Sequence, residues 1–142
     1  MSEIRQGTDA GECCGTIACM NPRQFAREWA DAWNRRDIEA VLAQFADDVV
    51  FTSPTALAIT GSAVVRGKDG LRAYWTTAMA KIRTLRFTVD RVLWDAELRE
   101  LAIIYIADIN GAARTVSENL LFDASDRVAT AEVFHGAPRM SD

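Results

Sequence analysis

Three side chains suited to proton transfer fall at positions that predict a shared, largely apolar face. Glu118 alternates with Val116 and Leu120 along one expected strand, which places its carboxyl group among apolar side chains. Tyr105 shares that face across an expected hairpin, and His135 lies on the inner face of the last expected strand. A buried carboxyl group, an imidazole and a phenol hydroxyl together suit proton transfer beside a carbonyl group. Glu118, His135 and Tyr105 are therefore the candidate catalytic residues.

Each candidate also has a purely structural explanation. A single inner-face histidine is more often a hydrogen-bonded structural residue. Glu118 can pair with Arg114 or Arg91, because buried charges are usually paired. Tyr105 can be a core residue with a hydrogen-bonded tip. The candidate ligand-binding residues carry aromatic rings or hydroxyl groups, and their spacing does not separate pocket lining from core: Trp29, Trp33, Phe51, Ser53, Tyr74, Trp75 and Phe122.

Apolar side chains at helical spacing predict three helices in the first half of the chain. The first covers residues 21–34 and begins with an Asn-Pro capping pair. The second begins after Asp37 and carries apolar side chains through Phe45, and the third covers residues 67–82. These helices surround a short strand over residues 49–52, which a long, mostly uncharged loop follows over residues 55–66.

From residue 84 onward the apolar period becomes two, which predicts four consecutive strands that end with residues 127–135. The apolar positions change phase after Arg91, and such a change indicates a bulge. Asn110 and Gly111 form the preferred pair for a two-residue hairpin turn. That turn predicts three opposed pairs, Ile109 with Ala112, Tyr105 with Val116 and Ile103 with Glu118.

Helices followed by a meander of strands predict the α+β class, with helices packed on a curved, mostly antiparallel sheet around a pocket. Residues 21–137 form the expected domain, and residues 138–142 a short tail. Residues 1–20 lack periodicity and predict a loosely ordered tail. This tail holds all three cysteines, Cys13, Cys14 and Cys19, which we interpret as reduced thiols, since a zinc site would need a fourth ligand.

The composition of the chain argues against several classes of binding partner. The formal net charge of -4 and the lack of a Lys/Arg cluster argue against nucleic-acid binding. No apolar run reaches the roughly 18 residues of a membrane helix, and the first 20 residues are no signal peptide, so we expect a cytoplasmic protein. The sequence contains no glycine-rich phosphate loop and no set of metal-ligating residues, so we expect no cofactor. Ile104, Ile106 and Leu121 predict an apolar outer face, and hence a homodimer through the sheet.

Short segments in a particular order resemble the nuclear transport factor 2-like superfamily, which includes SnoaL-like polyketide cyclases and ketosteroid isomerases. The resemblance covers about residues 21–137, and it implies a cone of helices on a strongly curved sheet with a pocket at the open end. The segments that carry it are residues 33–37 (WNRRD), 45–51 (FADDVVF), 66–75 (RGKDGLRAYW) and the final hairpin over 121–136.

The resemblance also places the catalytic positions of ketosteroid isomerases on this chain. The general base falls on Ser53, the oxyanion-hole tyrosine on Trp29, its supporting tyrosine on Trp75, and the second acid near Glu118. The sequence therefore departs from the isomerase pattern and keeps an acid at Glu118 alone.

Three function hypotheses follow. The first is an acid–base enzyme without cofactor that acts on a small apolar or aromatic carbonyl compound. The second is a non-catalytic module that binds such a ligand or mainly dimerises. The third is a protein-transport adaptor, which rests on fold analogy alone.

Overall fold

The structure is a computed structural model that describes residues 20–139. The predictions for the N-terminal tail and for its three cysteines fall outside this range, apart from residue 20. None of the helices within residues 20–139 is long and apolar enough to cross a membrane.

Four helices form in the described part of the chain, one more than the sequence predicted. The Asn21 side chain accepts a hydrogen bond from the Gln24 backbone N–H at 3.0 Å and so begins the first helix where the Asn-Pro pair predicted. The Asp37 side chain caps the second in the same way. The helices are α2 (Pro22–Asn34), α3 (Ile38–Leu42), α4 (Pro54–Thr60) and α5 (Gly67–Ala80).

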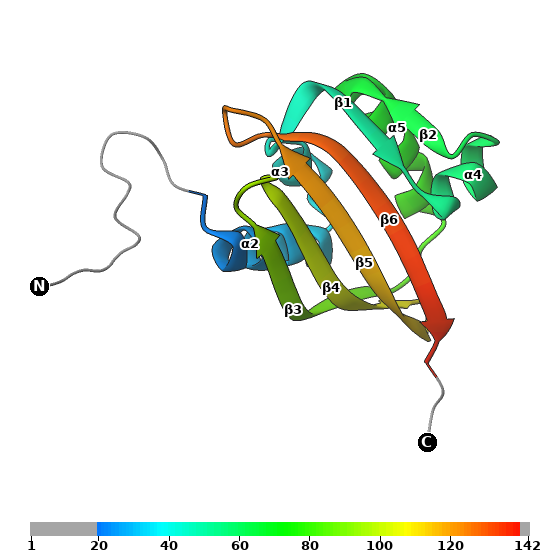
Figure 1. Cartoon of the computed structure of the whole chain (residues 1–142). Helices are drawn as coiled ribbons and strands as arrows, with labels where there is room; N and C mark the ends of the chain where they lie inside the picture. The colour runs from blue at the N-terminus through cyan, green and yellow to red at the C-terminus, as the bar shows by residue number, and fades with distance from the viewer. Residues whose placement is uncertain (1–19, 140–142) are drawn as a thin grey trace, which may run out of the picture.

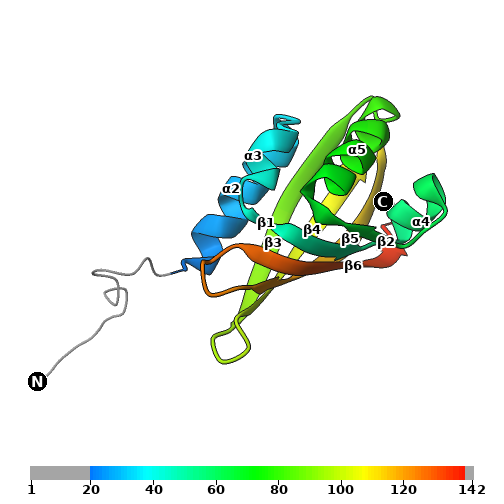
Figure 2. The same cartoon turned by 90° about the horizontal axis from the view of Figure 1, so that it is seen from above.

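Six strands form one curved sheet in the order β2-β1-β6-β5-β4-β3 (Figure 1). The sheet is antiparallel except where β1 runs parallel to β6. Its helices α2, α3 and α5 lie on one side, which leaves the opposite face of β4, β5 and β6 without a covering helix (Figure 2). The strands are β1 (Phe45–Thr52), β2 (Val64–Arg66), β3 (Leu85–Asp95), β4 (Glu100–Ile109), β5 (Ala112–Phe122) and β6 (Val128–Pro138).

The hairpin register is confirmed, because Asn110 and Gly111 both have positive φ and the turn joins β4 directly to β5. The predicted bulge is also confirmed between Val89 and Arg91. The observed pairs are those expected, Ile109 with Ala112, Tyr105 with Val116 and Ile103 with Glu118.

Three local predictions are wrong. Phe45 belongs to β1 and pairs with Val128, because long-range strand pairing outweighs its helical spacing from Val41. Residues 55–66 are no loop, since they hold most of α4 and all of β2. The last strand continues to Pro138, three residues beyond its expected end at residue 135.

Helix α2 attaches to the edge strand β3 through one side chain. The Asn34 amide donates to the Phe87 carbonyl at 3.0 Å and accepts from the Phe87 N–H at 2.8 Å. This pair of bonds occupies backbone groups that an edge strand would otherwise leave open. The contact fixes Trp33, on the preceding position, beside Phe87 at the inner face of the sheet.

Candidate functional site

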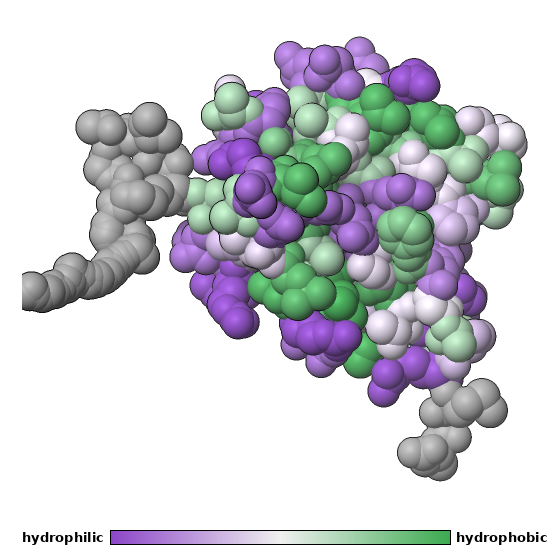
Figure 3. Space-filling view, in the orientation of Figure 1, coloured by the Kyte–Doolittle hydropathy of each residue, from purple (hydrophilic) through white to green (hydrophobic). Residues whose placement is uncertain are grey.

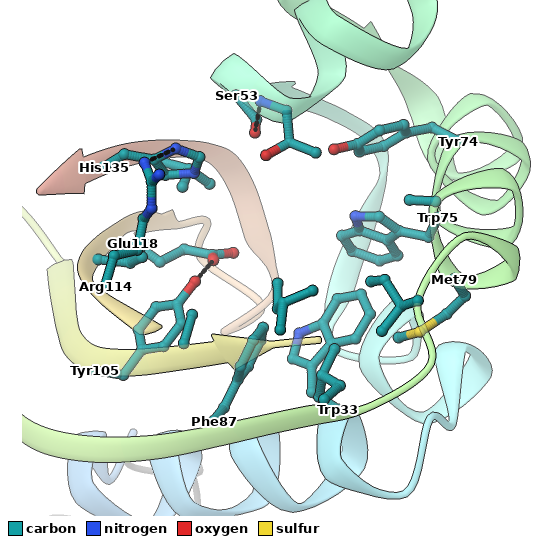
Figure 4. A pocket seen from close by; sticks show the side chains of 18 of the residues that line it. Trp33, Ser53, Tyr74, Trp75, Met79, Phe87, Tyr105, Arg114, Glu118 and His135 are labelled. Atoms are coloured by element: carbon teal, nitrogen blue, oxygen red, sulfur yellow. Dashed lines mark hydrogen bonds between the residues drawn. The ribbon is translucent and has the colours of Figure 1, made fainter. Parts of the chain in front are cut away.

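A cavity of about 350 Å³ opens between α5 and the inner face of the sheet (Figure 4). Its volume falls at the small end of the range of about 300–1,000 Å³ that is usual for ligand pockets. Strands β4, β5 and β6 supply several of the polar side chains of the wall, and Ser53, Thr55 and Tyr74 supply others. Helix α2, strand β3 and the rest of α5 supply mostly apolar side chains. The lining therefore has the apolar character and the few convergent polar groups of a small-molecule site.

The apolar end of the cavity is a cluster of aromatic rings around Trp75. Trp33 packs edge-on against Trp75 with 4.8 Å between ring centroids, and Phe51 does so at 5.6 Å. Phe87 lies beside Trp33 at 6.1 Å. Figure 4 shows Trp75 and Met79 on the side of the cavity opposite the Glu118 carboxyl group, and Phe87 between Tyr105 and Trp33. Such flat apolar walls suit an aromatic or alicyclic ligand body.

Glu118 and Tyr105 meet on the opposite wall. The Tyr105 hydroxyl donates to the Glu118 carboxyl at 3.3 Å, and the Glu118 side chain, only 5% exposed, reaches into the cavity (Figure 4). The alternative that Glu118 pairs with an arginine does not hold in the described part of the chain. Arg91 is paired with Asp90 at 2.5 Å, and Arg114 reaches His135. Glu118 is thus a buried acid with a hydroxyl partner and no cation.

Burial governs the charge of both groups. It raises the pKa of Glu118 from its ordinary value of 4.5 to about 7, and the hydrogen bond from Tyr105 opposes the rise. Burial also raises the pKa of Tyr105 well above its ordinary value, and the adjacent Glu118 adds to that rise. Near neutral pH the carboxyl group therefore exists in both protonation states, whereas the phenol stays a hydrogen-bond donor.

Ser53 and Tyr74 form a second polar pair across the cavity. Figure 4 shows the Tyr74 hydroxyl directed toward Ser53. Burial raises the pKa of Tyr74, the Ser53 hydroxyl opposes that rise, and Glu118 adds to it. The Ser53 Oγ also accepts from the Thr55 N–H at 3.1 Å and so caps α4. The hydroxyl at this position therefore has a structural role in addition to its place in the lining.

His135 lies at the mouth of the cavity and is solvent-exposed. Its Nδ1 atom is 3.3 Å from Nη1 of Arg114. Partial burial lowers the pKa of His135, and the Arg114 guanidinium lowers it further. The imidazole is thus neutral at pH 7, and in this contact Arg114 donates while Nδ1 accepts.

The structure brings most of the predicted site residues to one cavity. All three candidate catalytic residues line it, although His135 contacts Arg114 and not the other two. Trp29 and Phe122 do not line it: Trp29 is fully buried against Tyr105 and Phe87, and Phe122 packs on Phe25 and Trp94. The five other predicted ligand-binding residues line the cavity: Trp33, Phe51, Ser53, Tyr74 and Trp75.

Sequence reasoning missed Arg114, Met79 and Phe87 as lining residues. A signal for Arg114 existed, because it is an even-numbered residue of β5 and so shares the inward phase of Val116 and Glu118. Phe87 likewise occupies an inward-facing position of β3. Met79 lies one helical turn after Trp75, on the same stripe of α5.

The chain is similar to SnoaL-like and NTF2-like proteins. The sequence profile of the SnoaL-like domain matches residues 26–117. A SnoaL-like protein of unknown function from Burkholderia thailandensis is 34% identical, with a TM-score of 0.74 over 82% of this chain and 94% of that one. An NTF2-like protein of unknown function from Burkholderia pseudomallei is 25% identical, with a TM-score of 0.71 over 83% and 92%.

A computationally designed 17-OHP binder shares the fold, at 19% identity and a TM-score of 0.65 over 83% of this chain and 93% of that one. No curated protein matches the chain.

Proposed function

This chain belongs to the SnoaL-like domain family, and from that premise we propose that its cavity binds a small apolar or aromatic carbonyl compound. We further propose that Glu118 exchanges a proton with the bound compound, without a cofactor, as in isomerase- or cyclase-type chemistry. The observation that carries the proposal is the buried Glu118 carboxyl group, which faces an apolar cavity with a pKa of about 7. A general base works best when its pKa lies near the working pH.

In the proposed reaction the ionised Glu118 carboxylate takes a proton from the carbon next to the carbonyl group. The electron pair of that C–H bond forms a C=C bond while the π electrons of the carbonyl group move to its oxygen, so that the compound becomes an enolate. Tyr105 or Ser53 donates a hydrogen bond to this oxygen. The protonated Glu118 then returns a proton to the same or a neighbouring carbon, and His135 at the mouth exchanges protons with solvent.

Hydrogen–deuterium exchange of a simple ketone tests the proposal. We expect the protein to accelerate loss of the α-proton NMR signals of 2-tetralone in D2O, in a saturable manner. The rate should rise with pH through about 7, because the carboxylate form of Glu118 is the base. Acceleration that is absent, or that shows no change near pH 7, would contradict catalysis by Glu118.

A non-catalytic binding module is the second candidate, and one observation favours it. Ser53, at the position where the resemblance places the isomerase base, caps α4 and carries no acid. The same experiment separates the two functions, since a binding module would bind 2-tetralone, as seen in isothermal titration calorimetry, with no faster α-proton exchange.

The proposal includes a homodimer through the outer face of the sheet. Leu93, Leu121 and Phe134 are 57%, 39% and 51% exposed, and apolar patches cover part of that face in Figure 3. Phe134 pairs with Ser117 on the neighbouring strand, and Ser117 pairs with Ile104 on the next. Phe134 and Ile104 therefore lie in one row across the sheet. Burial of such a surface favours self-association. We expect a dimeric mass by analytical ultracentrifugation at micromolar concentration, and a monomeric mass would contradict this.

A further inference from the structure

We propose that the ligand of this cavity is a carboxylic acid, whose carboxylate is bound by Arg114 at the mouth while its apolar or aromatic body lies against Trp33 and Trp75. This inference rests on the proposed function, because it identifies the class of compound that the same cavity takes. A ligand that also carries a ketone within reach of Glu118 would be a keto acid.

Arg114 is the only cationic side chain that lines the cavity among the described residues. It projects from β5 on the inward side, and its nearest polar contact is the neutral His135 ring at 3.3 Å. Within residues 20–139 no carboxylate lies within ion-pair distance of Arg114. Other arginines of the chain do have acidic partners, as Arg72 does with Glu39 and Arg91 with Asp90.

An unpaired guanidinium at the rim of an apolar cavity favours an anionic ligand group. Its planar fork of N–H donors matches the two oxygens of a carboxylate, and the low polarity of the surroundings strengthens the attraction. One contact with His135 leaves further donors of Arg114 free, because a guanidinium carries five. A single cation matches a single negative charge, which favours a monocarboxylate.

The spacing along β5 fixes the orientation of such a ligand. Arg114 and Glu118 lie four residues apart on the same face, which is about 13 Å along the strand. Figure 4 shows that Arg114 turns toward His135, whereas the Glu118 carboxyl group points into the cavity. A carboxylate on Arg114 therefore leaves the body of the ligand next to Glu118 and Tyr105, with its far end on the aromatic cluster.

His135 supplies a direct readout, because it is the only histidine in the sequence. Arg114 is the charged group that faces it, and Glu118, Tyr105 and Tyr74 are the other titratable groups of the lining. Burial and Arg114 lower the pKa of His135 in the free protein. A carboxylate seated on Arg114 adds negative charge beside the imidazole and so should raise that pKa.

The test uses the full chain without a histidine tag and two probes of nearly equal shape, 2-naphthylacetate and 2-naphthylacetamide. Affinities are measured by isothermal titration calorimetry at pH 6, where Glu118 is mostly protonated. We expect the acid to bind at least ten-fold more tightly than the amide. Arg114→Gln should remove this preference, whereas Arg91→Gln, on the outer side of β3, should keep it.

An NMR titration of the His135 imidazole adds a second measurement, because a general loss of protein stability would not change the pKa of His135 in the same way. The pKa should rise in the presence of 2-naphthylacetate and stay unchanged with 2-naphthylacetamide. Equal affinities for the two probes, or a preference that survives in Arg114→Gln, would overturn this inference and leave the proposed binding function intact. Failure of both probes to bind would contradict the inference and the binding function together.

Discussion

Replacement of Glu118 with Gln should lower the rate of α-proton exchange in bound 2-tetralone by about 10²–10⁴-fold, the usual contribution of a general base. Gln has nearly the same shape, and its amide oxygen can accept the hydrogen bond that Tyr105 gives to Glu118. It has no carboxylate, so it removes the proton acceptor and keeps the cavity. The measurement is the pseudo-first-order loss of the α-proton signal in D2O at pH 8.

Glu132→Gln is the matched control for this experiment. Glu132 lies on β6, is solvent-exposed and is not part of the cavity lining, so its replacement should leave the exchange rate within two-fold of the wild type, about 0.4 kcal/mol. Tyr105→Phe gives a second comparison, because loss of its hydrogen bond should raise the pKa of Glu118 and move the pH profile upward. An unchanged exchange rate in Glu118→Gln would show that another group is the base.

Glu118→Gln should also change how the free energy of unfolding depends on pH. The pKa of Glu118 is about 7 in the folded protein and 4.5 at its ordinary value, so the folded state binds this proton more tightly than the unfolded state. Glu118 therefore makes the folded protein less stable as pH rises from about 4.5 to above 7. With about 1.4 kcal/mol for each pKa unit, the loss is about 3 kcal/mol.

The difference between wild type and Glu118→Gln isolates this effect, because the other titrating groups are the same in both proteins. Urea unfolding at a series of pH values from 4 to 9 measures it. We expect the free energy of unfolding of the wild type to fall by about 3 kcal/mol relative to that of Glu118→Gln across this range. A difference that stays constant with pH would mean that the folded protein does not raise the pKa of Glu118.

Local signals in the sequence predicted the part of the fold that forms the wall of the cavity. The Asn110-Gly111 turn specifies the β4–β5 register on its own, because two residues with positive φ allow only one tight connection. That register and the alternation of inward residues were enough to place Glu118 beside Tyr105. The pairing of these two residues was therefore accessible without a structure.

The missed features depend on contacts between distant segments or on a signal with two meanings. The parallel pairing of β1 with β6 joins residues about eighty positions apart, and no local pattern encodes it. Ser53-Pro54 marks the end of a strand in the sequence, and the same pair is also an N-cap with proline in the first turn of α4. Trp29 and Trp33 share one stripe of α2, and the position of β3 decides that Trp33 alone borders the cavity.

The proposed function requires that Glu118 be a buried acid that changes its charge near neutral pH. The most direct measurement is a ¹³C NMR titration of the glutamate side-chain carboxyl groups, with the Glu118 signal assigned by its loss in Glu118→Gln. We expect a Glu118 pKa of about 7, well separated from those of the solvent-exposed glutamates. A Glu118 signal that titrates near its ordinary value of 4.5 would contradict the claim, and with it the proposed role as a base.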